Sequence, residues 1–165
     1  MTSQGTGKVW TARLPGGPWT VFADISAHSD GTREDPFMWI DTRGHWHIIN
    51  HMYSTSQVSD CGNSSLSDHL FSEDGKAWHT LNVEPYSHTV SYGDGSQHTY
   101  TTLERPNCHF DAAGRMTHIN LAADMMTQDS GCANYATCPA KVGGQCACTN
   151  CKYADHAGTI IIALD

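Results

Sequence analysis

The chain has 165 residues, 39% of them hydrophobic, and a formal net charge of −8. This length suits one domain with a buried core, and no apolar run approaches the ~20 residues that span a membrane. The nine Lys and Arg are scattered, with no basic stripe to follow a phosphate backbone, which argues against nucleic acid as a partner.

Short strands separated by turns are predicted along most of the chain, because no stretch sustains the apolar period of a helix. The first hairpin joins Phe37–Ile40 to His45–Ile49 through the turn Asp41–Gly44. Further strands with tight turns are expected over 69–81 (turn at 73–76), 89–101 (turn at 93–96) and 108–121 (turn at 111–114). The predicted fold class is therefore all-β.

An internal repeat becomes visible when the chain is compared with itself at an offset of seventy positions. The matches fall on a carboxylate, a proline, two turn residues and the second strand: Glu34 with Glu104, Pro36 with Pro106, Asp41 with Asp111, Gly44 with Gly114, Ile49 with Ile119 and Asn50 with Asn120. The units near 34–50 and 104–120 suit four-stranded propeller blades with their loops. Two unrelated hairpins with common turn residues are the alternative, but so many matches at one offset favour the repeat.

The last third of the chain is rich in cysteine. Five of the seven Cys lie between Cys132 and Cys151, and the segment 127–151 is predicted to be a Cys-rich loop before a final strand at 159–164. Disulfides in an oxidising compartment are one interpretation, and the glycosylation sequon at Asn63 agrees with it. Zinc held by thiolates is the other. Cys61 and Cys108 are expected either to pair with each other or to remain buried thiols.

Two acidic motifs precede the strands of the repeat, Arg33-Glu34-Asp35-Pro36 and Leu103-Glu104-Arg105-Pro106. We expect Asp35 to face a central channel, with Glu34 less central because adjacent strand residues point to opposite faces. Two carboxylates that face one channel are what glycoside cleavage requires, since one must be ionised and the other protonated. Alternatively, Asp35 and Glu104 cap turns or pair with Arg33 and Arg105 at the protein surface.

Histidines and tryptophans give less specific signals. His45 and His47 alternate along one strand, with His51 further on, and they either bind a metal or sugar hydroxyl or are solvated surface groups. The tryptophans are expected to pack between sheets, although one of them can instead serve as a platform on which a sugar stacks.

These motifs together resemble a known enzyme group. Arg33–Phe37 resembles the Asp-Pro motif on the second blade of family 43 and family 32 glycoside hydrolases, and Glu104-Arg105-Pro106 resembles their third-blade motif. The segment 72–78, Ser-Glu-Asp-Gly-Lys-Ala-Trp, is similar to a turn common in these blades, and the ending at 155–160 resembles an uncharacterised group related to family 43. The resemblance implies a partial five-bladed β-propeller of about two to three blades, forming one domain over 1–165.

The resemblance also implies an activity and a set of site residues. The activity would be hydrolysis of glycosidic bonds in a neutral oligosaccharide or polysaccharide, with Glu104 as the general acid and Asp35 as its electrostatic partner. Substrate contacts are implied for Arg33, Glu34, Arg105, His156 and Trp39. A late-blade histidine such as His156 holds a central cation, for example calcium, in related propellers.

The chain departs from that enzyme group at its beginning. No Asp-Pro motif precedes Arg33, so the third carboxylate, a base or nucleophile on the first blade, is not found. Met1–Trp10 also lacks the apolar segment of a signal peptide. We therefore expect a chain that is incomplete at its N-terminus and lacks catalysis as it stands, from an extracellular or secretory-pathway protein. The alternatives are a carbohydrate-binding propeller without turnover and a Cys-rich metal-binding or interaction module.

Overall fold

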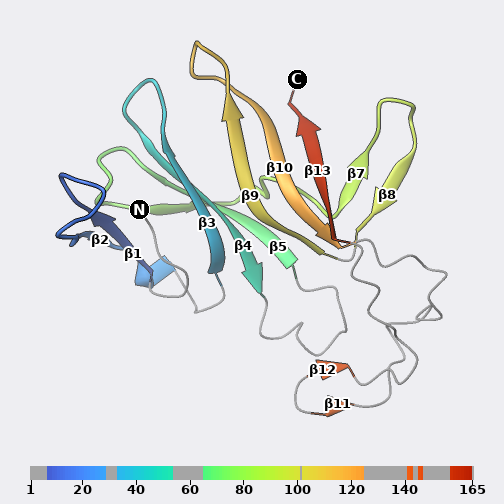
Figure 1. Cartoon of the computed structure of the whole chain (residues 1–165), viewed down its shortest axis with the longest axis horizontal. Helices are drawn as coiled ribbons and strands as arrows, with labels where there is room; N and C mark the ends of the chain where they lie inside the picture. The colour runs from blue at the N-terminus through green and yellow to red at the C-terminus, as the bar shows by residue number, and fades with distance from the viewer. Residues whose placement is uncertain are drawn as a thin grey trace.

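The computed structural model describes residues 7–28, 33–53, 65–100, 102–124, 141–142, 145–146 and 157–164. Over these residues the chain forms β-strands and one short 3-10 turn, η1, at Ser26–His28. The predicted all-β class is confirmed (Figure 1). No helix in this part of the chain is both long and apolar enough to cross a membrane.

The first sheet has four antiparallel strands in chain order: β3 (Arg33–Ile40), β4 (Trp46–Tyr53), β5 (Ser65–Ser72) and β6 (His79–Leu81). The turn between β3 and β4 forms because the Asp41 carboxylate accepts hydrogen bonds from the backbone amides of Arg43 and His45, each at 2.9 Å. Gly44 completes the turn with a φ of 87°, which a residue with a Cβ rarely adopts. The hairpin predicted from this segment is confirmed.

The second sheet has the order β13-β10-β9, with β9 at Thr102–Phe110, β10 at Met116–Asp124 and β13 at Ala157–Ala163. The β9–β10 turn repeats the chemistry of the first hairpin, because Asp111 accepts from the amides of Ala113 and Arg115. The predicted final strand is β13, which joins the sheet with Asp124 opposite Ala157. Asp124 and Ala157, which flank the segment 125–156, are therefore neighbours in this sheet.

Three two-stranded sheets complete the described part of the chain. They pair β1 (Lys8–Thr11) with β2 (Thr20–Asp24), β7 (Thr89–Ser91) with β8 (Gln97–Thr99), and β11 (Lys141–Val142) with β12 (Gln145–Cys146). Within the predicted Cys-rich loop, β11 and β12 are the described residues. No sheet closes on itself over the residues described, so the fold is a set of open antiparallel sheets.

The core lies on both faces of β4. Ile48 and Ile49 are adjacent and both buried, because successive strand residues point to opposite faces. Ile48 packs in a cluster with residues of β1, β2 and β5 and with Trp78, and Trp46 packs against this cluster. Ile49 packs in a second cluster with residues of β9 and β10. The predicted packing role of the tryptophans is confirmed for Trp46 and Trp78.

The second cluster joins the two large sheets through their leading strands. Strands β3 and β9 lie side by side in the middle of the molecule (Figure 1). Phe37 and Trp39 of β3 pack against a cluster that includes Leu103 and Cys108 of β9. Cys108 is a buried free thiol, and burial raises its pKa to about 12. Of the two predictions for this cysteine, the buried thiol is confirmed.

Candidate functional site

Strand β3 contains a bulge at its acidic motif. Glu34 pairs with His51 of β4, and the next pair along the strands is Phe37 with Ile49. The dipeptide Asp35-Pro36 therefore occupies the space that one residue would fill in a regular ladder. A bulge of this kind bends the strand and redirects side chains, and bulges are frequent next to functional sites.

Strand β9 contains the same bulge. Glu104 pairs with Ala122 of β10, and the next pair is Asn107 with Asn120, so Arg105-Pro106 faces a single residue. The two bulges lie seventy positions apart, at the offset of the sequence repeat. The repeat thus extends to an irregular feature of the backbone, which ordinary turn chemistry does not explain.

Both bulges have strained backbones. Asp35 has a φ of 47° and Arg105 a φ of 55°, and over the described residues these two are the non-glycine positions with positive φ. The left-handed conformation costs about 1–2 kcal/mol for a residue with a Cβ, and a following proline restricts the preceding residue further. Strain of this kind concentrates at functional sites, where the surrounding structure maintains it.

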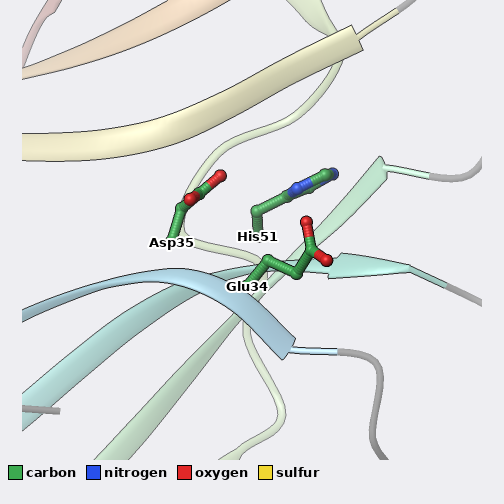
Figure 2. Close-up of side chains that lie close together, drawn as sticks. All are labelled: Glu34, Asp35 and His51. Atoms are coloured by element: carbon green, nitrogen blue, oxygen red, sulfur yellow. The ribbon is translucent and has the colours of Figure 1, made fainter. Parts of the chain in front are cut away.

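The first bulge turns two adjacent carboxylates the same way. One ligand atom each of Glu34, Asp35 and His51 lies within 4.8 Å of the others, and Figure 2 shows the three side chains converging. The expectation that Glu34 points to the opposite face from Asp35 is wrong. Its physical reason is the bulge, because the alternation of faces holds only along a regular strand.

Arg105 joins the acids of the two sheets. Its Nε lies 3.9 Å from the Asp35 carboxylate, and its Nη2 lies 3.7 Å from the Glu104 carboxylate. The Arg105 side chain is 67% exposed, whereas Asp35 and Glu104 are each 23% exposed. The structure therefore brings Asp35 and Glu104 to one guanidinium. We call Glu34, Asp35, His51, Glu104 and Arg105 the carboxylate cluster.

Arg33 has a different environment from the one expected. Its guanidinium forms an ion pair with Asp68 of β5, and its Nε donates to the same carboxylate at 2.6 Å. Asn50 donates to the other Asp68 oxygen at 2.9 Å. The side chains of Arg33 and Asp68 are 11% and 8% exposed, so this buried network links β3, β4 and β5 and pairs the charge of Arg33 within the sheet.

His51 is the buried member of the cluster, with none of its surface exposed. Burial lowers the pKa of the imidazole below its usual value, although the nearby Asp35 and Glu34 carboxylates act to raise it. His51 is therefore neutral near pH 7, and a neutral imidazole has a lone pair to offer. The sequence placed His51 in a loose group of strand histidines, and its pairing with Glu34 is what assigns it to this site.

Tyr86 is a cluster neighbour that the sequence did not reveal. Its backbone is held by Ser67, whose hydroxyl donates to the Tyr86 carbonyl at 2.7 Å. The Tyr86 side chain is buried, and its hydroxyl has no hydrogen-bond partner in the described structure. Burial, followed by the charges of Asp35 and Glu104, raises its pKa well above the usual value. Tyr86 lies in the connection between β6 and β7, where no motif marks it.

The other predicted site residues lie away from the cluster. Trp39 lies further along β3, with its ring stacked on His47 at a centroid distance of 4.6 Å. His47 approaches Asp41 at 3.4 Å and His69 at 3.0 Å, near the turn end of the hairpin. His156 lies outside the described residues. The predicted set is thus divided between the bulge end and the turn end of the first sheet.

Comparison of the chain with models of known protein families, with curated proteins and with solved structures finds no match. A functional interpretation therefore depends on the residues and the geometry of the chain itself.

Proposed function

We propose that this chain belongs to a β-propeller protein, similar to family 43 and family 32 glycoside hydrolases, that cleaves glycosidic bonds in a neutral glycan outside the cell. Glu104 is the general acid and Asp35 its electrostatic partner. One observation carries the proposal. Asp35 and Arg105 occupy equivalent strained bulges on adjacent sheets, and the Arg105 guanidinium lies within 4 Å of the Asp35 and Glu104 carboxylates.

Glycoside cleavage needs this kind of pair. A carboxylic acid must protonate the leaving oxygen while another carboxylate stays ionised beside the positively charged transition state. Asp35 and Glu104 are half-buried, so the field between them is screened less than it would be in water. Arg105 is exposed enough to turn from the carboxylates to a sugar hydroxyl when a glycan enters.

A third carboxylate, which serves as the base or nucleophile in the resembling families, is not assigned within the described residues. Asp24 precedes the first motif, but its carboxylate accepts from the Ser26 amide at 3.0 Å and approaches Lys8 at 3.6 Å. Asp30, the other early acid, lies outside the described residues. The proposal leaves the base to a residue beyond the described part of the chain.

The test compares glycosides with good and poor leaving groups. Glu104→Gln is expected to lower kcat/KM on alkyl glycosides roughly 10²- to 10⁴-fold, because the leaving oxygen then lacks its proton donor. Dinitrophenyl glycosides need no such proton, so their hydrolysis should change little. Glu84→Gln, at an exposed loop position, is the matched control and should behave as the unaltered protein.

Equal losses on both substrate classes would contradict the role of Glu104. A protein that also carries the first-blade base and hydrolyses neither class contradicts hydrolysis itself. If that protein still binds neutral oligosaccharides, and binding survives Glu104→Gln, a carbohydrate-binding propeller without turnover is the correct interpretation.

A further inference from the structure

The first bulge brings together the ligand set of a metal ion. Two carboxylates and an imidazole converge within 4.8 Å, from neighbouring positions of β3 and from the residue paired with Glu34 on β4 (Figure 2). Ligand atoms around one ion, with bonds of about 2.0–2.2 Å, lie closer together than this, so the three side chains would move inwards when the ion binds. We propose that Glu34, Asp35 and His51 bind a divalent transition-metal ion of the zinc and manganese class.

The local charges favour a cation here. Glu34 and Asp35 are adjacent, and the bulge makes their carboxylates share one small space. Of the two arginines nearby, Arg33 is engaged by the buried Asp68, and Arg105 divides its contacts between Asp35 and Glu104 at 3.9 and 3.7 Å. A divalent ion would offset the repulsion between the two carboxylates more fully than a distant, exposed guanidinium does.

A second, independent group points to the same place. The Tyr86 hydroxyl is buried without a hydrogen-bond partner in the described structure, and it lies in the field of Asp35 and Glu104. A buried hydroxyl without a partner costs about 1–3 kcal/mol. An ion beside Asp35 would bring solvent with it, since a three-ligand protein site leaves a coordination position for water, and such water is the kind of partner that this hydroxyl lacks.

The repeat supplies an internal comparison. The bulge of β9 has the same backbone, but Arg105 stands where β3 has Asp35, and Ala122 pairs with Glu104 where His51 pairs with Glu34. Two of the three ligands are therefore replaced, one of them by a cation. Only the first of the two bulges has the donors for a metal ion.

The donor set also selects among metals. An imidazole with two carboxylates suits zinc, manganese and iron, whereas calcium takes six to eight oxygen ligands. The calcium implied by the resemblance, at a late-blade histidine, is a different site. Asp35 belongs to both proposals, but the metal site does not depend on glycoside hydrolysis, because Glu104 is no ligand in it and metal binding is measured without a glycan.

The experiment must separate this site from the cysteines, which also bind zinc. We would alkylate the thiols of the full chain, remove metals, and titrate with Mn²⁺ while the EPR signal of free Mn²⁺ is recorded, since manganese prefers oxygen and nitrogen ligands to thiolates. One ion per chain is expected. Glu34→Gln and Asp35→Asn should each weaken binding by at least roughly 10- to 100-fold, the loss typical even of outer-shell changes.

Matched controls are available on the neighbouring strand β9 and at the turn of the β3–β4 hairpin. Glu104→Gln removes the proposed general acid but no metal ligand, and should affect Mn²⁺ binding much less than Glu34→Gln or Asp35→Asn, so the two proposals can fail separately. His45→Gln tests the Asp41–His47 group near the turn and should have no effect. Binding that persists in both Glu34→Gln and Asp35→Asn, or a chain that binds no Mn²⁺, would overturn the site. Glu34 and Asp35 lie on β3, an edge strand of its sheet, so we expect both variants to fold. Circular dichroism of each variant checks this.

Discussion

The bulge of β3 and the bulge of β9 have the same backbone but different surroundings. Arg33, which leads into the first bulge, forms a buried ion pair with Asp68, whereas Leu103 at the equivalent place is fully buried among apolar side chains. On the third strand of each sheet, His69 lies beside Ile49, and Ile162 lies beside Ile119. The first sheet is polar at places where the second is apolar.

This difference shows that a strained backbone can be repeated while its chemistry is not. Glu34 and Asp35 face a buried histidine, and Glu104 and Arg105 face an alanine. The backbone determines where side chains point, and the residue types then determine whether the place attracts a cation or supplies one. The two bulges meet because β3 and β9 are adjacent, so one site draws on both.

The largest test of the comparison is Arg33→Met. The substitution keeps an unbranched apolar stem but removes the guanidinium, so the Asp68 carboxylate is left buried without its cation, which typically costs about 3–5 kcal/mol. The double variant Arg33→Met with Asp68→Asn should recover part of this loss, because no buried charge remains. Urea unfolding of the three proteins measures the effect. A loss below about 1 kcal/mol in the single variant would show that this ion pair is solvated and that the two sheets are more alike than we describe.

The next test uses pH. Burial, and then the charge of His47, lower the pKa of His69 from 6.5 to about 4. The unfolded chain therefore binds this proton more tightly than the folded chain does. The free energy of unfolding is highest above pH 6.5, where His69 is neutral in both states, and it decreases as pH falls towards 4. The loss should be of the order of 2 kcal/mol, since each unit of pKa difference corresponds to about 1.4 kcal/mol and exposure reduces it.

Unfolding free energies measured across this interval, for the unaltered protein and for His69→Gln, give the answer. The variant should show a flatter profile, because glutamine does not titrate. The carboxylates with lowered pKa values, such as Asp41 and Asp111, also begin to lose stabilisation below about pH 5, but both proteins carry them, so the difference between the two profiles reports His69. If the free energy of unfolding changed with pH equally in the two proteins, His69 would be solvated.

The smallest test concerns the strain itself. Arg105→Gly and Arg105→Val both remove the guanidinium, so their difference reports the backbone. Glycine should be more stable than valine by about 1 kcal/mol at this position, since it adopts positive φ without a Cβ penalty. Asn107, two residues along β9, is the control, and there valine should equal or exceed glycine. The same order at both positions would mean that the bulge of β9 is not strained in solution.

Local chemistry explains what the sequence could predict. Asp41 with Gly44, and Asp111 with Gly114, mark turns because the aspartate accepts from amides within the turn itself. The hairpins around them follow from these local signals, whereas the approach of Asp35 and Glu104 to Arg105 is a contact between strands distant in sequence. The direction of Glu34 does not follow from local signals either, because the bulge arises from the pairing of β3 with β4.

Tertiary contacts account for the rest. Tyr86 reaches the cluster through Ser67, which is distant in sequence, and no motif marks either residue. The repeat also hides a shift of register: Ile49 pairs with Phe37, whereas Ile119 pairs with Cys108, because β10 has a further irregularity between Met116 and His118. Comparison of the sequence with itself at an offset of seventy does not reveal this irregularity, because it changes the strand pairing and not the spacing along the chain.

The pairing of Asp124 with Ala157 has a consequence for the architecture of the chain. Because the segment between them starts and finishes at facing positions of β10 and β13, its length is not dictated by the sheet. Exchanging residues 125–156 for a short hairpin turn would leave every described pair of that sheet available. A foreign module grafted between Asp124 and Ala157 is therefore compatible with the sheet that carries Glu104.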